Sequence, residues 1–274
     1  MRGCDASMIA SVTREALLLE VDTSPKPGLV DLWSNGSHHD LNPWLFYQSA
    51  LALAPYFRDF ARLGASWSGM DPESLFQDVR EIGKEAEDAM FKATGGVNTH
   101  KGALFSLGIL DTAWGYAQKQ GIASAGTVCL LASHMASTSL ARELFLLGRS
   151  LPRSHGERVL HRYGVRGIRA EVMGGFPSVR RYGLPVLQSK GGWRDNHARL
   201  SALVGLMAHV EDSNLLHRGG REGLLFVRQA MRDLSPARRL EDQLAALDEP
   251  FISRNLSSGG AADLLSVAMV CSRI

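Results

Sequence analysis

Residues 95–102 read Gly-Gly-Val-Asn-Thr-His-Lys-Gly and separate two long helical patterns. The two glycines allow a sharp turn and a close approach to a ligand. Asn98 and Thr99 are residue types that cap helices, so the apolar run at 103–110 predicts a helix beginning here. A helix N-terminus exposes main-chain N–H groups, and His100 and Lys101 add side-chain donors, so phosphate would bind well at this stretch. A simple capped turn between helices is the alternative, and these residues alone leave it open.

On both sides of this stretch, apolar residues recur about every 3.6 positions along most of the chain. The spacing predicts helices over residues 6–21, 43–63, 71–93, 103–118, 125–147, 152–163, 196–210, 221–233, 236–247 and 261–271. Pro55 predicts a kink or a break in the second helix, and residues 164–177 are expected to form a glycine-rich connection. No alternating strand pattern bounded by hairpin turns is found. We therefore predict an all-α protein, a compact single-domain multi-helix bundle over residues 1–274 with glycine-rich polar loops lining a cleft.

The composition excludes several classes of protein. A net charge of +2 over 274 residues argues against a nucleic-acid binder, which usually has a strong basic excess. There is no run of about 18 apolar residues to span a membrane, and the N-terminal residues lack the apolar segment of a signal peptide. Cys4, Cys129 and Cys271 lie far apart without CxxC spacing, so we expect neither a disulfide framework nor a cysteine zinc site. These features predict a cytoplasmic protein.

Five polar loops at the ends of the predicted helices share one composition. Each combines glycine, which admits a close ligand, with Lys or Arg, which binds phosphate, and with an acid or an amide. Their residues are 24–28 followed by Asp31, 95–102 preceded by Glu87, 166–171 leading into 174–177, 211–214 followed by 218–220, and 254–260 followed by Asp263. Five such loops in one helical chain indicate a shared cleft for a polyanionic, sugar-bearing ligand.

Each loop residue also has a purely structural interpretation. Lys26, between two prolines, could be a solvated loop lysine, and Asp212 with Asn214 could only cap a helix. The functional interpretation of Asp212 is a magnesium site, since Mg²⁺ prefers a few carboxylates together with substrate phosphates. The acidic stripe at 78–88 is typical of a solvated helix face, and His38-His39 lacks the spacing of a zinc site. Neither a P-loop nor a dinucleotide-binding glycine motif is present.

Four of these segments resemble the triphosphoribosyl-dephospho-CoA synthase family. They are Ser-Pro-Lys-Pro-Gly-Leu-Val-Asp (24–31), Gly-Gly-Val-Asn-Thr-His-Lys-Gly (95–102), Glu-Asp-Ser-Asn-Leu-Leu-His-Arg-Gly-Gly (211–220) and Arg-Asn-Leu-Ser-Ser-Gly-Gly-Ala-Ala-Asp-Leu-Leu (254–265). The resemblance implies a helical, cytoplasmic pentosyltransferase. Such an enzyme joins ATP and 3′-dephospho-CoA through a ribosyl–ribosyl bond and releases adenine. The product is the prosthetic-group precursor for an acyl carrier protein of citrate lyase or malonate decarboxylase, to which a separate transferase passes it.

The resemblance also implies roles for individual residues. It assigns proton handling or stabilisation of the reacting sugar carbon to Asp31, His100 and Glu171. It assigns magnesium binding, with ATP as the substrate, to Asp212 and Glu87. Contacts to phosphates and sugars are assigned to Lys26, Asn98, Lys101, Arg169, Asn214, Arg218, Gly219, Asn255, Ser257 and Asp263. ATP and 3′-dephospho-CoA are the expected small-molecule partners; neither a nucleic acid nor a membrane is expected as a partner, and a homo-oligomer is left open.

The match departs from the family pattern at four positions. Ala170 stands where glycine is usual, Met173 where a second acid is usual, and His39 where a lysine is common. Ser213 replaces a frequent threonine, which is a mild change. Two other functions therefore stay open at this point: a magnesium-dependent nucleotide N-glycoside hydrolase that uses the same cleft, and a non-catalytic CoA- or nucleotide-binding protein. The sequence also does not decide whether citrate lyase or malonate decarboxylase uses the product.

Overall fold

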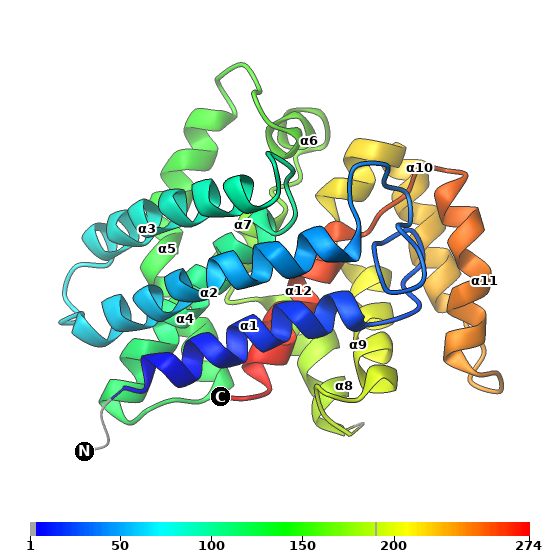
Figure 1. The fold of residues 1–274 in the computed structure, drawn as a ribbon. Helices are drawn as coiled ribbons and strands as arrows, with labels where there is room; N and C mark the ends of the chain where they lie inside the picture. Colours follow the sequence, from blue (N-terminus) through cyan, green and yellow to red (C-terminus); the bar gives the residue numbers. More distant parts are fainter. Residues whose placement is uncertain (1–3, 190) are drawn as a thin grey trace.

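The computed structural model describes residues 4–189 and 191–274, and helices account for its architecture (Figure 1). Within those residues there are twelve α-helices, one short π-helix and no β-strand, which confirms the all-α prediction. The α-helices are α1 (Ala6–Asp22), α2 (Pro43–Ser66), α3 (Pro72–Ala93), α4 (Lys101–Gln120), α5 (Ala125–Leu147), α6 (His155–Tyr163), α7 (Ile168–Met173), α8 (Leu184–Ser189), α9 (Asn196–His209), α10 (Ser213–Arg232), α11 (Leu240–Ile252) and α12 (Gly259–Cys271), and the π-helix is η1 (Val179–Gly183). Residues 1–3 of the N-terminal segment discussed above lie outside the described part.

Several helix boundaries differ from the predicted ones. Helix α2 continues through Pro55 without a break, and α11 starts at Leu240 and runs through Pro250. Helix α10 starts eight residues earlier than predicted because Asp212 caps it, and the chain bends within it at Gly220, whose φ is 63°. The expected connection at 164–177 contains the short helix α7, and α8 and η1 were not predicted.

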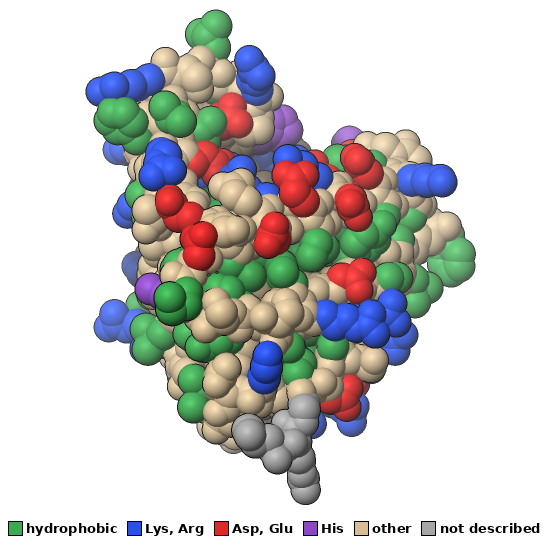
Figure 2. Space-filling model, turned by 90° about the vertical axis from the view of Figure 1, so that its left-hand side faces the viewer, with side chains coloured by type: hydrophobic (Ala, Val, Ile, Leu, Met, Phe, Trp, Pro, Cys, Tyr) green, Lys and Arg blue, Asp and Glu red, His purple; other side chains and the backbone are tan. Residues whose placement is uncertain are grey.

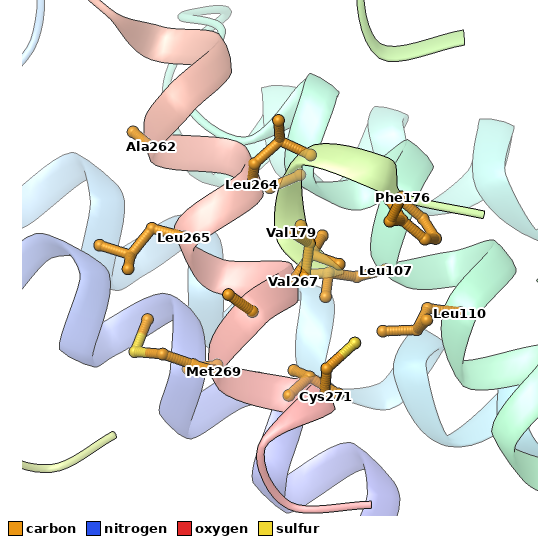
Figure 3. Packing of buried hydrophobic residues seen from close by; sticks show 14 of the residues in the cluster. Leu107, Leu110, Phe176, Val179, Ala262, Leu264, Leu265, Val267, Met269 and Cys271 are labelled. Atoms are coloured by element: carbon orange, nitrogen blue, oxygen red, sulfur yellow. The ribbon is translucent and has the colours of Figure 1, made fainter. Parts of the chain in front are cut away.

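Helix α4 lies in the centre of the bundle, and almost every residue from Ala103 to Ala117 is buried. Helix α2 crosses α4 closely at Gly64, where a Cβ atom would lie 1.8 Å from the carbonyl oxygen of Thr112. Helix α12 packs its apolar residues against α4 and against the segment around Phe176 and Val179, as Figure 3 shows. Each buried Leu or Phe side chain contributes about 1.5–3 kcal/mol to stability. The packing of these side chains therefore holds α12 in place against α4.

The core also contains two of the three cysteines. The Sγ atoms of Cys129 in α5 and Cys271 in α12 are 3.7 Å apart, and both residues are free thiols, as is Cys4. The wide sequence spacing gave no hint of this proximity. Among the described helices, none has the length and apolar character needed to cross a membrane.

Candidate active site

A large open cleft of about 1130 Å³ lies where several helices begin. Five of the described helices, α4, α6, α7, α10 and α12, contribute residues of their first turn or their N-cap to its lining. The C-terminal part of α1 contributes Glu20. Figure 2 shows basic, acidic and histidine side chains gathered beside a hollow below the upper projection of the molecule. Because a helix N-terminus carries partial positive charge and free N–H groups, this arrangement favours a phosphate-rich ligand.

The C-terminal half of the loop 95–102 lines the cleft, and its N-terminal half makes the turn that leads there. Gly95 and Gly96 have positive φ values of 65° and 90° and provide the turn rather than a ligand contact, since neither lines the cleft. The N-cap of α4 is His100, one or two residues later than expected, and Asn98 accepts a hydrogen bond from the main-chain N–H of Lys101 (3.2 Å). Asn98, His100 and Lys101 all line the cleft. The ammonium group of Lys101 forms an ion pair with Glu87, and Glu87 itself is not among the lining residues.

His100 is buried at the edge of the cleft. Its Nδ1 atom shares a 2.7 Å hydrogen bond with the hydroxyl of Ser49, whereas its Nε2 atom has no partner within the described structure. Burial, together with the nearby charge of Lys26, lowers the pKa of His100 to about 3. The imidazole is therefore neutral at physiological pH and has one ring nitrogen free for a ligand.

Asp212 links two helix N-termini. Its Oδ1 accepts the N–H groups of Asn214 (2.8 Å) and Leu215 (3.2 Å), and its Oδ2 accepts the N–H of Ala261 in α12 (2.9 Å). Burial raises the pKa of Asp212, partly offset by these hydrogen bonds. Asp212 lines the cleft, but its oxygens already bind main-chain donors, so the structure gives it the capping role.

Two acidic side chains from distant parts of the sequence, Glu20 and Asp263, line the cleft near one another. Asp263, in the second turn of α12, packs so closely against α4 that a Cβ atom at Gly102 would lie 2.0 Å from its Oδ2. Burial and the nearby charges of Glu20 and Asp212 raise the pKa of Asp263 well above its usual range. Asp263 is therefore the group in this cleft best suited to keep a proton near neutral pH.

Glu20 is held by Lys26. The Lys26 ammonium group donates to the Glu20 carbonyl oxygen (2.6 Å) and forms an ion pair with Glu20 Oε1, and both side chains are almost fully buried. Lys26 was predicted to contact phosphates, but it does not line the cleft, whereas Glu20 does. No feature of the sequence singled out Glu20, although a lysine buried between two prolines requires an acidic partner.

Asp31 also has a role within its own loop. Its carboxylate accepts main-chain N–H groups from Lys26 (2.6 Å), Trp33 (2.7 Å) and Ser34 (2.9 Å), and the residue is 2% exposed. Asp31 does not line the cleft. The structure thus places this predicted catalytic residue as a brace for the loop that carries Lys26.

Arg218 joins the loops on another side of the cleft. Its guanidinium donates to the carbonyl oxygen of Asn255 (2.9 Å), to Asn255 Oδ1 (2.6 Å) and to the carbonyl oxygen of Ser37. Ser257 hydrogen-bonds to His38 Nε2 (2.9 Å), and burial and the charge of Arg218 lower the pKa of His38 to about 4. Arg218, Asn255, Ser257 and His38 line the cleft; Gly219 and His39 do not.

Arg169 and Glu171 reach the cleft from the unpredicted helix α7. Arg169 is paired with Glu143 (2.9 Å), and the carboxylate of Glu171 accepts the hydroxyl (2.6 Å) and the N–H (3.1 Å) of Ser178. Burial raises the pKa of Glu171. Of the two departures in this segment, Ala170 lines the cleft and Met173 does not.

The predicted magnesium ligands do not form a metal site together. In the described part of the chain, no three His, Cys, Asp or Glu side chains are grouped so that they could hold a metal ion. Asp212 is occupied by main-chain donors and Glu87 pairs with Lys101 outside the lining. These residues therefore do not fit a resident magnesium ion.

The cleft, the helix termini and the acids on its floor define an all-α protein with a site suited to a phosphate-rich substrate. A family model described as "ATP:dephospho-CoA triphosphoribosyl transferase" matches residues 6–274. The chain therefore belongs to the ATP:dephospho-CoA triphosphoribosyl transferase family, which confirms the resemblance and makes it a transferase of this family.

The printed names of similar proteins agree with this assignment. A "Probable 2-(5''-triphosphoribosyl)-3'-dephosphocoenzyme-A synthase" of Azotobacter vinelandii is 40% identical, with 98% of this chain and 92% of the relative covered. The "2-(5''-triphosphoribosyl)-3'-dephosphocoenzyme-A synthase" of Pectobacterium atrosepticum is 39% identical over 92% of this chain and 84% of the relative. "Protein CitXG" of Haemophilus influenzae is 40% identical over 93% of this chain and 57% of its own length. No solved structure matches the chain.

Proposed function

We propose that this protein joins ATP to 3′-dephospho-CoA, giving 2′-(5″-triphosphoribosyl)-3′-dephospho-CoA and free adenine. The observation that carries the proposal is the cleft itself. Five helix N-termini surround a volume of about 1130 Å³, large enough for nucleotide-sized ligands, and the acids Glu20 and Asp263 are among its lining residues. Family membership identifies the reaction, and the cleft has the groups that this reaction needs.

The chemistry makes three demands on the protein. The bond between C1′ of the ATP ribose and adenine N9 breaks through an oxocarbenium-like state, which nearby negative charge stabilises. The 2′-hydroxyl of dephospho-CoA must lose its proton as its oxygen bonds to C1′, and the departing adenine must gain one. The triphosphate is retained in the product, so the protein must hold it without cleaving it.

We assign the proton transfers to Glu20 and Asp263. Glu20 Oε1 is engaged by Lys26, which leaves Oε2 to take the proton of the 2′-hydroxyl and to place negative charge near C1′. Asp263, whose pKa is raised, donates a proton to the adenine as the C1′–N9 electron pair leaves with it. After turnover the proton passes from Glu20 to Asp263, so the site returns to its starting state. Two acids in different surroundings, one paired with a lysine and one not, are the usual basis for such a division of roles.

The remaining cleft residues bind and orient. The free Nε2 of His100 is placed to hydrogen-bond a sugar oxygen, and Lys101 and Arg169 can exchange their carboxylate partners for phosphate. Glu171 stays a second candidate for proton handling because its pKa is also raised. We propose magnesium only as part of the Mg·ATP substrate, held by the phosphates.

The test is release of adenine. Purified protein with ATP, Mg²⁺ and dephospho-CoA should release adenine, measured by chromatography, together with a product of the summed mass less adenine, measured by mass spectrometry. An Asp263→Asn variant should be slower by about 100-fold or more, as expected for loss of a general acid. Equal adenine release without dephospho-CoA would instead establish an N-glycoside hydrolase. Binding of both nucleotides without turnover would establish a non-catalytic binding protein.

The downstream steps are part of the same proposal. We propose that the protein acts in the cytoplasm and that a separate transferase passes the product to an acyl carrier protein of citrate lyase or malonate decarboxylase. Incubating the purified product with that transferase and each apo carrier protein should label one carrier, as measured by intact mass. Light scattering of the purified protein tests the homo-oligomer.

A further inference from the structure

One wall of the cleft carries basic side chains to which the resemblance assigns no role, although one of them, His217, lies within the motif at 211–220. Arg153 directly precedes the N-cap of α6, His155 and Arg158 lie at the start of α6, and His217 lies in the second turn of α10. The rings of His155 and His217 are stacked, with centroids 3.8 Å apart and planes inclined by 19°. Together these four side chains form what we call the α6–α10 wall.

The α6–α10 wall differs from the other basic groups of the cleft in its lack of partners. Lys101 is paired with Glu87 and Arg169 with Glu143. Within residues 4–189 and 191–274, Arg153 and Arg158 form no ion pair, and the ring nitrogens of His155 and His217 form no hydrogen bond. A neighbouring carboxylate, that of Glu157, accepts the main-chain N–H of Arg153 (2.6 Å) and forms no ion pair with either guanidinium. Guanidinium groups and imidazole N–H donors gathered in a concave site without ion-pair partners favour an anion.

The surroundings of the two imidazoles show how closely the positive groups are gathered. Burial, Arg158 and Arg218 lower the pKa of His155, and burial, His155, Arg158 and Arg218 lower that of His217. The same cleft is also lined by the carboxyl groups of Glu20, Asp212 and Asp263. Because these groups cannot bind phosphate as a cation does, the α6–α10 wall is the more favourable surface for it.

We propose that the α6–α10 wall is a second polyphosphate subsite, built by His155, His217, Arg153 and Arg158 and separate from the N-terminus of α4. The subsite rests on the proposed function in one respect: the reaction brings two polyphosphate chains into one cleft, the triphosphate of ATP and the pyrophosphate of dephospho-CoA. Two chains that are each multiply negative repel one another, so binding them at once requires separate cationic surfaces. The α6–α10 wall supplies the second surface.

The first experiment measures binding without turnover. Inorganic pyrophosphate and tripolyphosphate are titrated into the wild-type protein, the Arg158→Ala/His217→Ala variant and the Arg162→Ala variant by calorimetry. Arg162 lies on the same helix α6 but does not line the cleft, so its variant controls for the loss of a positive charge. We expect the double variant to bind at least about 10-fold more weakly and the control to match the wild type, since charge-assisted contacts are among the stronger polar interactions. Unchanged binding in a double variant with wild-type circular dichroism overturns the proposal.

The second experiment identifies which substrate uses the subsite. KM is measured for ATP and for dephospho-CoA separately, and the double variant should raise one of them about 10-fold or more with little change in the other. A rise confined to dephospho-CoA assigns its pyrophosphate to the wall, and a rise confined to ATP assigns the triphosphate. Equal rises for both substrates contradict a separate subsite. If the wild-type protein releases no adenine, the proposed function fails, but the calorimetry still decides whether the α6–α10 wall binds polyphosphate.

Discussion

The carboxylate of Asp212 accepts the main-chain N–H of Ala261 at 2.9 Å, across a separation of 49 residues. The same carboxylate caps α10, so a single side chain ties the N-termini of α10 and α12 together at the edge of the cleft. Glycine at position 260 permits this approach, since a Cβ atom there would lie 3.1 Å from the Asp212 carboxylate. The link positions Asn214 and Asp263, the residues that follow the two helix starts.

Replacing Asp212 should therefore cost more than loss of an ordinary helix cap. We expect Asp212→Ala to lower the free energy of unfolding by about 2 kcal/mol or more, because the cap is lost and a buried N–H group is left without an acceptor. Asp212→Asn, which keeps one carbonyl oxygen, should cost less. The comparison is Asp71→Ala, which removes the exposed cap of α3 and should cost about 1 kcal/mol. Urea unfolding measures all three, and an Asp212→Ala cost no larger than that of Asp71→Ala would contradict the double role.

The buried pair of Glu20 and Lys26 allows stability to be separated from catalysis. Removing either charge leaves the other buried without compensation, so Glu20→Gln and Lys26→Met should each destabilise the protein by about 3–5 kcal/mol. The double variant removes both charges and should recover most of that loss. Denaturant unfolding of the four proteins gives the coupling free energy directly.

Activity should follow a different pattern in the same four proteins. If Glu20 accepts the proton of the attacking hydroxyl, the stable double variant still lacks the base. Its rate of adenine release should then be lower than that of the wild type by at least about 100-fold. A double variant that is both stable and fully active would show that the pair serves only the fold.

The sequence predicted the periodic parts of this protein well because local rules determine them. The N-cap residues and the apolar spacing of α1, α3 and α5 are local signals, and those helices start and end close to the predicted residues. Helices α7 and α8 were missed because each is only six residues long, too short to show a period. The early start of α10 was missed because glycines at 219 and 220 interrupt the helical pattern.

The candidate site was predictable where a loop motif carried the residues and not where packing brings residues together. Lys101, Arg218, Asn255 and Asp263 lie in such motifs and do line the cleft. Glu20 lies in an ordinary helical pattern, and only the burial of Lys26 reveals its place in the site. His155 and Arg158 are exposed residues of a short polar helix, and the sequence does not show that α6 packs beside α10. The glycines at 102 and 260 predicted the close approach of a ligand. In the structure, the carboxylates that approach them are those of Asp263 and Asp212.

Gly102 and Gly83 make a matched pair for testing the placement of Asp263. Both are helical glycines, but a Cβ atom at Gly102 would lie 2.0 Å from Asp263 Oδ2, whereas one at Gly83 in α3 would meet nothing within 4 Å. We expect Gly83→Ala to stabilise the protein by about 0.5–1 kcal/mol and to leave adenine release unchanged. Gly102→Ala should displace the Asp263 carboxyl and lower kcat about 10-fold or more, since catalysis is sensitive to shifts of about 1 Å. Thermal unfolding and adenine release distinguish the two, and a fully active Gly102→Ala variant would argue against a reacting role for Asp263.

The neutral, buried His100 makes stability depend on pH in a definite direction. Its pKa of about 3 in the folded protein lies below the value of about 6.5 expected in the unfolded chain. Between these values the unfolded chain binds a proton that the folded protein does not, so the contribution of His100 to stability is complete above about pH 6.5 and decreases as the pH falls toward 3. At pH 5 the loss should be about 2 kcal/mol relative to pH 7. In His100→Gln this part of the pH dependence should disappear, so its unfolding free energy should change less between pH 7 and pH 5 than that of the wild type. His134→Gln, which removes an exposed imidazole from α5, is the control, and parallel pH profiles for the wild type and His100→Gln would show that His100 is not buried in its neutral form.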